Sequence, residues 1–281
     1  MQALFLNLGG LVSPNGGARF AMLHRPTGAP RGLVVYAHAF SEEMNKSRRM
    51  VALQARALAL AGHAVLIPDL LGCGDSAGDF GDAGWADWID ELVSACQWLR
   101  QSCRDWLPSA QAETPPLTLW GLRGGALLAA AAAAQLGDVP TLLLWQPAAT
   151  GKPLLQQFLR LHSVAALTGD GERSNTGTLK ALLAAGETVE VAGYRLSPAL
   201  AHGLEQARLS PAAGVRQLHW LELSSREDAT LSPASTGCLA AWQQAGTQVH
   251  TKVLRGPAFW QTLEIEDAPA LVDATLAAMT A

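Results

Sequence analysis

The first chemical question concerns Arg123, which stands in the stretch LWGLRGG at residues 119–125. Apolar residues precede this stretch and an alanine-rich run follows it, which is typical of a strand, a tight turn and a helix. In turns of the pattern G-x-S-x-G, a nucleophilic serine occupies the central position. An arginine in that place stays protonated, so it can neither attack a carbonyl group nor accept a proton.

Three other polar stretches could share a site with Arg123, because each follows an apolar run that predicts a strand. His38 lies in AHAFSEE, Asp69 begins DLLGCGDS, and Asp228 lies in SSRED. In an open α/β sheet, the loops at the carboxyl ends of the strands surround the ligand crevice. We therefore expect these four stretches to meet at one end of the sheet.

The elements that position these loops can be read from the hydrophobic pattern. Apolar, β-branched runs alternate with segments of helical periodicity, which predicts an α/β protein with a mostly parallel sheet. One helical segment repeats apolar residues at spacings of three and four from Trp85 to Cys103, so we expect a buried stripe there. The predicted strands are 2–8, 19–25, 31–38, 63–69, 116–121, 139–146, 217–224 and 248–254. The predicted helices are 46–61, 84–106, 123–136, 233–245 and 268–280.

Residues 150–214 interrupt this alternation. About 65 residues separate the strand that ends near Gln146 from the one that starts at Gln217, and a single crossover helix needs far fewer. The interval also holds a polar stretch, GDGERSNTG, at 169–177. We expect one domain over 1–281, with 150–214 inserted as a lid over one end of the sheet.

The order of these loops resembles the α/β-hydrolase fold, in which an oxyanion loop, a DxxGxGxS loop, a nucleophile elbow, a lid, an acid strand and a histidine strand follow one another. More narrowly, HAFSEEMNKSRRM, DLLGCGDS, EVAGYRLS and FWQTLEI are similar to the second hydrolase-like protein family associated with bacterial exosortase A (PEP-CTERM) systems. The resemblance covers essentially the whole chain. It implies an eight-stranded, mostly parallel sheet with flanking helices and an inserted lid, and a link to exopolysaccharide and exosortase-dependent surface proteins.

The resemblance also assigns the family's catalytic positions. Asp228 takes the place of the triad carboxylate, Arg123 the place of the nucleophile, and Ala258 in GPAFW stands near the place of the histidine. With neither serine nor histidine present, the usual Ser-His-Asp chemistry is expected to be absent. Of the seven histidines, only His38 falls at the crevice end of the sheet, in the family's oxyanion loop. Its role stays open between shaping that loop and contacting a ligand.

Two roles are open for Arg123. A cation at the N-terminus of a helix is disfavoured by the macrodipole, so a negative group is expected nearby. That group is either Asp228, in a salt bridge that plugs the crevice, or a carboxylate or phosphate on a bound ligand. Phe40, Trp260, Trp145 and Tyr194 either pack in the core or line an apolar pocket beside the arginine. Such a pocket would suit an amphipathic anion.

The remaining acidic residues of these loops have local explanations. Glu42 and Glu43 are expected to start a helix, to pair with Arg48 and Arg49, or to contact a ligand. Asp69 is expected to fix the turn after its strand by accepting hydrogen bonds from backbone amides.

Composition excludes several classes of protein. The chain is 281 residues long, 49% hydrophobic and 16% charged, with a net charge of −4, which does not suit a nucleic-acid partner. It has no apolar run long enough to span a membrane and no signal-peptide pattern, so we expect a cytoplasmic protein without a membrane span. Four cysteines form no CxxC pair and no metal-type cluster, so we expect free thiols, no metal and no cofactor. Cys73 borders the crevice but lacks a base histidine.

Three functional interpretations remain. The first is a degenerate hydrolase, or pseudoenzyme, that binds an anionic small molecule or a protein partner through residues such as Arg123, Asp228 and His38. The second is an active hydrolase of an ester, thioester or amide with a non-standard site, its water activated by Asp228 or a lid side chain. The third is a pure protein-interaction module, which predicts a filled crevice.

Overall fold

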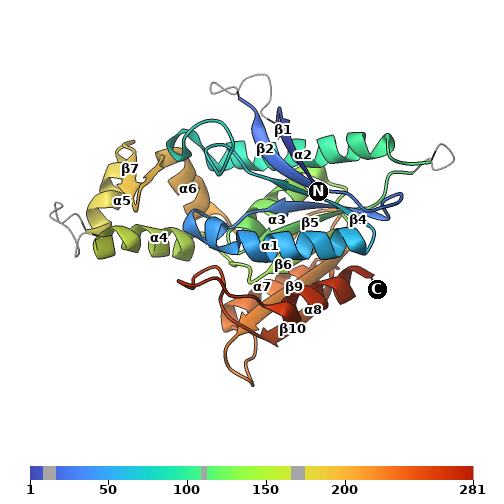
Figure 1. The fold of residues 1–281 in the computed structure, drawn as a ribbon. Helices are drawn as coiled ribbons and strands as arrows, with labels where there is room; N and C mark the ends of the chain where they lie inside the picture. Colours follow the sequence, from blue (N-terminus) through green and yellow to red (C-terminus); the bar gives the residue numbers. More distant parts are fainter. Residues whose placement is uncertain (9–16, 109–112, 166–174, 281) are drawn as a thin grey trace.

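The computed structural model describes residues 1–8, 17–108, 113–165 and 175–280. These residues form an eight-stranded sheet in the order β1-β2-β4-β3-β5-β6-β9-β10 (Figure 1). β2 pairs antiparallel with both β1 and β4, and every other neighbouring pair is parallel. The predicted eight-stranded, mostly parallel sheet is confirmed. Its strands are β1 (Gln2–Leu6), β2 (Arg19–His24), β3 (Gly32–Ala37), β4 (His63–Pro68), β5 (Leu117–Leu122), β6 (Thr141–Trp145), β9 (Gln217–Ser224) and β10 (Gln248–Arg255).

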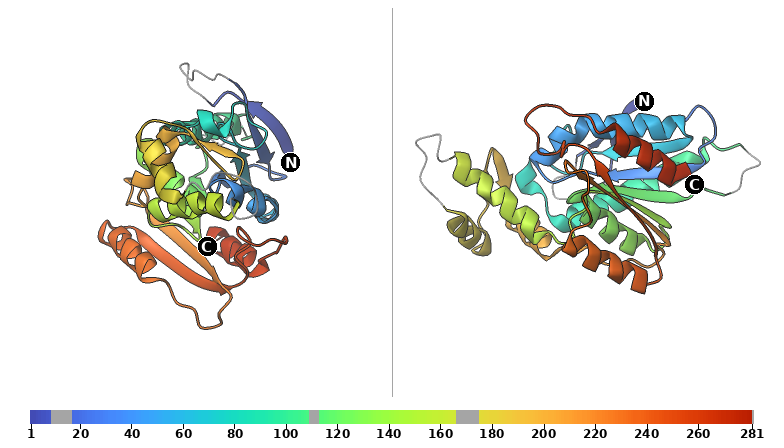
Figure 2. Two further views of the ribbon diagram at one scale, coloured as in Figure 1. Left: turned by 90° about the vertical axis from the view of Figure 1, so that its left-hand side faces the viewer. Right: turned by 90° about the horizontal axis from the view of Figure 1, so that it is seen from below.

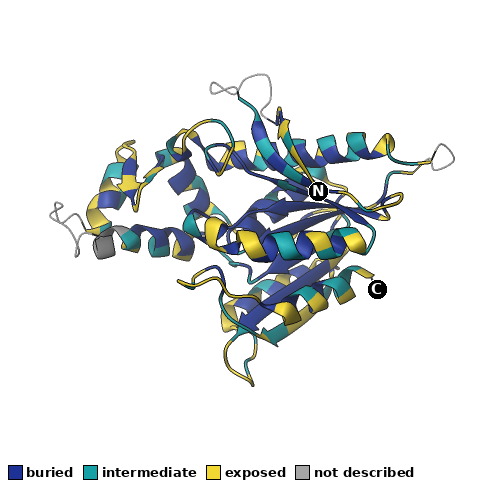
Figure 3. Cartoon of the chain, viewed as in Figure 1, coloured by how far each residue is buried: buried dark blue, intermediate teal, exposed yellow. Residues whose placement is uncertain are grey.

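Helices cover both faces of the sheet (Figure 2). One face packs against α2 (Trp85–Arg104), α3 (Gly125–Leu136) and α7 (Pro233–Gln244). The other packs against α1 (Glu42–Leu60) and α8 (Pro269–Thr280). Because it is covered on both sides, the central strand β3 is buried at all six residues, and exposed residues gather on the outer faces of the helices (Figure 3).

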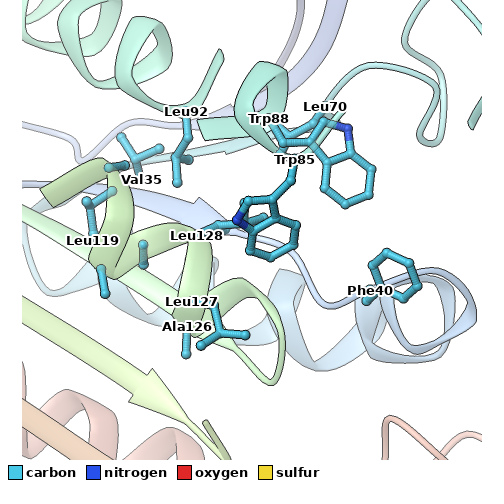
Figure 4. Packing of buried hydrophobic residues seen from close by; sticks show 14 of the residues in the cluster. Val35, Phe40, Leu70, Trp85, Trp88, Leu92, Leu119, Ala126, Leu127 and Leu128 are labelled. Atoms are coloured by element: carbon cyan, nitrogen blue, oxygen red, sulfur yellow. The ribbon is translucent and has the colours of Figure 1, made fainter. Parts of the chain in front are cut away.

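The apolar stripe predicted for α2 is confirmed. Trp85, Trp88 and Leu92 lie in one cluster with Leu128 of α3 (Figure 4), and Cys96 and Cys103 are fully buried in the same core. α3 is rich in alanine, which lets it approach the sheet closely. At its start, a Cβ at Gly125 would collide with the carbonyl oxygen of Ala37 in β3, so only glycine fits there.

All five predicted helices are present, but α1 starts at Glu42 rather than at 46. Glu42 and Glu43 occupy its first turn, where negative charge is favourable, although their polarity hides the start of the apolar periodicity. A short 3-10 helix, Phe80–Asp82, precedes α2 and was not predicted.

The segment between β6 and β9 holds elements that the sequence pattern did not reveal. These are α4 (Lys152–Ala165), α5 (Thr176–Ala184), the antiparallel pair β7 (Val189–Val191) and β8 (Tyr194–Leu196), and α6 (Pro198–Gln206). They lie together at one end of the sheet (Figures 1 and 2). Most of the polar stretch at 169–177 falls outside the described residues.

A buried ion pair ties the antiparallel edge of the sheet to α2. Arg19 of β2 donates from Nε to Glu91 Oε1 at 2.7 Å, and both side chains are almost completely excluded from solvent. Glu91 also accepts the backbone N–H of Leu71 at 2.7 Å. Burial raises the pKa of Glu91, while Arg19 and the Leu71 amide oppose that shift.

Among the helices that the structure describes, none is both long enough and apolar enough to cross a bilayer. The described residues likewise contain no cluster of three or more histidine, cysteine or acidic side chains that could hold a metal ion.

Candidate functional site

Arg123 stands in the sharp turn between β5 and α3. Its φ is 55°, in the left-handed region that residues other than glycine seldom adopt. The turn is held by backbone hydrogen bonds: the Arg123 N–H donates to Trp145 O at 3.0 Å, and its carbonyl accepts from Ala126 at 3.2 Å and Ala148 at 3.3 Å. The predicted strand, turn and helix are therefore present, with the backbone strain typical of a nucleophile elbow.

The side chain of Arg123 is paired with Glu43 of α1. Its Nη2 lies 3.2 Å from Glu43 Oε1, and its Nε lies 3.3 Å from both carboxylate oxygens. Gln157 of α4 bridges the pair, because its Oε1 accepts from Arg123 at 3.3 Å and its Nε2 donates to Glu43 at 3.3 Å. Gln261, after β10, donates to the same carboxylate at 3.5 Å, and the guanidinium lies 5.7 Å from the ring centre of Trp260.

This cluster joins three distant parts of the chain over the elbow, and it leaves almost no open volume. The cavity beside Glu43 measures 10 Å³ and is closed by Phe40, Leu154 and Phe158. A volume of roughly 10–15 Å³ holds one water molecule. This cavity has no room for an organic substrate.

Burial controls the electrostatics of the pair. The Glu43 side chain is 6% exposed and the Arg123 side chain 16%. Burial raises the pKa of the Glu43 carboxyl, whereas the Arg123 charge and the hydrogen bonds from Arg123 and Gln261 oppose that shift. The Arg123 charge therefore favours the ionised form of Glu43 against the effect of burial.

The salt bridge expected between Arg123 and Asp228 is wrong. Asp228 is exposed on the loop after β9, and within the described chain it takes part in no ion pair. On that same loop, Glu227 pairs with Arg255 at 2.8 Å, far out in solvent. The Arg123 side chain instead pairs with Glu43, which is buried at the start of α1 close to the elbow. A negatively charged partner for Arg123 was correctly expected, but it is Glu43 of α1 and not Asp228.

Of the local roles open for Glu42 and Glu43, the helix start is confirmed, because both lie in the first turn of α1, whereas Glu43 pairs with Arg123 and not with an arginine of its own helix. Arg48 binds Asp69 at 3.1 Å, and Arg49 forms a two-point pair with Asp267 at 2.7 and 2.8 Å. The role predicted for Asp69 is confirmed, because its Oδ2 accepts the backbone N–H of Asp75 at 3.1 Å and fixes the turn after β4.

His38 lies in the loop after β3 but does not reach Arg123. It is 2% exposed, and its Nδ1 lies 2.8 Å from the carbonyl oxygen of Ala39. Burial lowers its pKa, and its ring packs edge-on against Trp88. Its Nε2 has no hydrogen-bond partner among the described residues. His38 therefore lines a different part of the molecule from the elbow.

The aromatic candidates divide between the crevice and the core. Phe40 closes the crevice and packs against Phe80, Trp88 and Phe158. Trp260 faces the guanidinium, whereas Trp145 is fully buried in the sheet and donates its Nε1–H to Thr275 at 2.9 Å. Tyr194 of β8 packs on Phe80 and Phe158. Phe40 and Trp260 thus lie near Arg123, and Trp145 is a core residue.

Two substitutes for the missing catalytic groups find no support in the geometry. Ala258 is half-buried against the core beside Phe259 and carries no titratable group. Cys73 is buried, and desolvation together with Asp69 and Glu91 raises the pKa of its thiol, which disfavours the reactive thiolate. No histidine whose side chain the structure describes forms a hydrogen bond or ion pair with Arg123, Glu43 or Asp228.

Sequence reasoning missed Gln157 and Gln261 and gave Glu43 the wrong partner. Gln157 lies in the segment between β6 and β9, to which no helix was assigned, although Leu154, Leu155, Phe158 and Leu159 recur there with helical spacing. One signal could have identified Glu43: HAFSEE places it a few residues beyond the oxyanion loop, at the same sheet end as Arg123.

No known protein-family profile matches the chain, and no curated protein sequence matches it. Solved structures, in contrast, superpose on the chain over nearly its whole length. Est1E from Butyrivibrio proteoclasticus with bound ferulic acid superposes with a TM-score of 0.59 at 15% identity, covering 99% of this chain and 98% of that one.

Two further solved structures show the same likeness. A highly thermostable carboxyl esterase from Bacillus coagulans gives a TM-score of 0.59 at 17% identity, with coverage of 99% and 97%. The mouse alpha/beta hydrolase domain-containing protein 10 gives 0.58 at 16% identity, with the same coverage. At such identities the likeness concerns the fold, and the elbow, flanking helices and sheet order agree with it. The chain has the α/β-hydrolase fold.

Proposed function

We propose that this protein is a degenerate α/β hydrolase whose former catalytic crevice binds a ligand instead of cleaving one. The observation that supports this most strongly is the ion pair between Arg123 and Glu43, which occupies the place of the nucleophile. A protonated guanidinium cannot form an acyl-enzyme, and no histidine side chain that the structure describes is hydrogen-bonded to Arg123 or Glu43 to accept a proton.

The proposed ligand is an amphipathic molecule with a carboxylate. Glu43 already presents a carboxylate to Arg123, so a ligand carboxylate could take its place with the same charge-assisted hydrogen bonds. Phe40, Leu154, Phe158 and Trp260 would then contact the apolar body. Ferulic acid, bound by the structural neighbour Est1E, is a carboxylic acid of this kind and makes a practical probe.

Residues 150–214 would serve as the lid of this site. They contribute Leu154, Gln157 and Phe158, the side chains that close the 10 Å³ cavity from the side opposite α1. Admission of a ligand then requires α4 to move away from Glu43, which breaks the hydrogen bonds of Gln157 and the packing of Phe158 against Phe40.

The resemblance of HAFSEEMNKSRRM and the neighbouring motifs supports a role in exosortase-linked or exopolysaccharide systems, with a protein partner as the second candidate ligand. The four free cysteines fit a cytoplasmic location, where thiols stay reduced.

The first test asks whether the protein turns over esters. Purified protein is incubated with short and medium p-nitrophenyl esters and with a fluorophosphonate probe. We expect no turnover and no labelling in the wild type or in Arg123→Ala. Turnover that disappears in Glu43→Gln would establish a non-standard hydrolase and overturn the proposal. A double variant, Arg123→Ser with Ala258→His, asks whether the scaffold regains labelling.

The second test measures binding of ferulic acid and octanoate by calorimetry. We expect Glu43→Gln to bind about tenfold more tightly than the wild type, because the competing internal carboxylate is gone, and Arg123→Ala to lose binding. Arg100→Ala is the matched control, since Arg100 forms its 3.0 Å ion pair with Asp138 away from the elbow. Unchanged or absent binding in all variants would favour a pure interaction module.

A further inference from the structure

A groove lies between α8 and the two outer strands β9 and β10, which run side by side (Figure 1). Its volume is 630 Å³, within the range of roughly 300–1,000 Å³ that ligand sites occupy. Gln217 and Gln248, the first residues of β9 and β10, line it, whereas Arg123 follows the last residue of β5. Because these strands are parallel, the groove lies at the opposite end of the sheet from the elbow, and it shares no lining residue with the cavity beside Glu43.

The register of the two strands makes the floor of this groove polar. Gln217 lies beside Gln248, and His219 lies beside His250. Residues two apart on a strand point to the same face, so these four side chains and Lys252 share one face of the sheet. The α8 residues that border the groove are all alanines, whose small side chains leave this polar floor open.

The two histidines offer hydrogen-bonding atoms to the groove. Their ring centres lie 5.0 Å apart with the planes inclined by 15°. Neither ring nitrogen of His219 is hydrogen-bonded to a described residue, and neither is sealed from solvent, so a bound molecule can reach them. Burial and the neighbouring His250 lower the pKa of His219 to about 4, so at neutral pH its ring presents one donor and one acceptor.

The charge of the groove has one sign. Lys252 lines it and forms no ion pair with any described residue. An adjoining cavity of 250 Å³ shares Gln217 and His219 with the groove and adds Arg31, which is likewise in no ion pair among the described residues. Although the chain has 24 acidic residues, no acidic side chain lines either space. Walls of this kind attract an anion.

We propose that this groove binds a small phosphate monoester, such as a nucleoside or sugar phosphate, with its phosphate at Lys252 and its polar body hydrogen-bonded to the glutamine and histidine side chains. Lysine suits phosphate because it presents a compact point charge, and the neutral amides and imidazoles match a body rich in hydroxyl or ring nitrogen atoms. This inference goes beyond the proposed function of the elbow and does not depend on it.

The test titrates the full chain with AMP and with ribose 5-phosphate, each beside its uncharged counterpart, adenosine or ribose, followed by saturation-transfer NMR. We expect saturable binding of at least one phosphate and about tenfold weaker binding of its counterpart, the ratio that one charge-assisted contact provides. Lys252→Gln should weaken the phosphate to the level of its counterpart, whereas Lys152→Gln, the same charge change on exposed α4, should not. Ala277→Trp, which fills the groove from an exposed position on α8, should abolish binding.

Three results would overturn the proposal: equal binding of each phosphate and its counterpart, phosphate binding that survives both Lys252→Gln and Ala277→Trp, or no saturable binding of either phosphate at millimolar concentration. The comparison with the uncharged counterparts needs only wild-type protein, so it stands even if a variant fails to fold. Arg123→Ala should bind the phosphate as the wild type does, which separates this site from the elbow. Loss of phosphate binding in Arg123→Ala would instead assign that binding to the elbow.

Discussion

Two arginines pair with glutamates inside this molecule, and the two pairs are built differently. Arg19 and Glu91 meet at 2.7 Å with both side chains shielded from solvent, and Glu91 also accepts a backbone amide. Arg123 and Glu43 meet at 3.2–3.3 Å, share their hydrogen bonds with two glutamines, and retain some exposure at the arginine. The first pair fixes two elements of the fold. The second has longer contacts and interchangeable partners, which suits a site that can open.

The largest effect should come from breaking the tighter pair. Glu91→Ala leaves Arg19 charged and buried and removes the acceptor of the Leu71 amide, so we expect a loss of about 3–5 kcal/mol in the free energy of unfolding. Urea denaturation followed by circular dichroism measures this. Glu91→Gln keeps an acceptor for the amide and should lose less. If Glu91→Ala lowers the free energy of unfolding by less than Arg123→Met does, the Arg19–Glu91 pair is not the more stabilising of the two.

Breaking the elbow pair should cost less. Arg123→Met leaves Glu43 with hydrogen bonds from Gln157 and Gln261, so we expect a loss of about 2 kcal/mol in the free energy of unfolding. The double variant Arg123→Met with Glu43→Gln removes both charges and should recover most of that loss. If the double variant is as unstable as the sum of the single variants, the two side chains are not energetically coupled.

The contribution of Glu43 to stability should depend on pH. Burial raises its folded-state pKa above 4.5, so the folded state binds the proton more tightly than the unfolded state. Its contribution to stability is therefore complete below pH 4.5 and is lost as the pH rises through the folded-state pKa. The unfolding free energy of the wild type minus that of Glu43→Gln should fall from pH 4 to pH 8. Parallel curves for the two proteins would show that Glu43 does not titrate in this way.

The smallest effect should come from a pair that is exposed. Arg255 and Glu227 lie 2.8 Å apart with 70% and 83% of their side chains in solvent. Arg255→Ala should change the free energy of unfolding by no more than about 0.5 kcal/mol, because water and salt screen such pairs. A larger change would mean that the distance between the charged groups, and not their burial, determines how much an ion pair stabilises this protein.

The sequence predicted the fold well because its signals are local. The central strands of the main sheet are apolar runs, and the stripe from Trp85 to Cys103 repeats with the period of a helix. The site was harder, because its partners come from three separate elements. Arg123 and Phe40 could be placed from motif order. Gln157 reaches the elbow only because α4 packs over it, and the helical periodicity of α4 does not specify that long-range contact. Asp228 was one of the two partners considered for Arg123 because the family pattern was carried over, and the competing carboxylate of α1 was not considered.

The left-handed backbone at Arg123 does not require a nucleophile at that position. The strand before the turn and the close approach of the glycine-led helix after it hold the φ torsion of an arginine in the left-handed region. A search for a serine between glycines would pass over this turn, whereas a search by torsion angle would find it. The turn can therefore be recognised from its backbone conformation, although no serine stands at its centre.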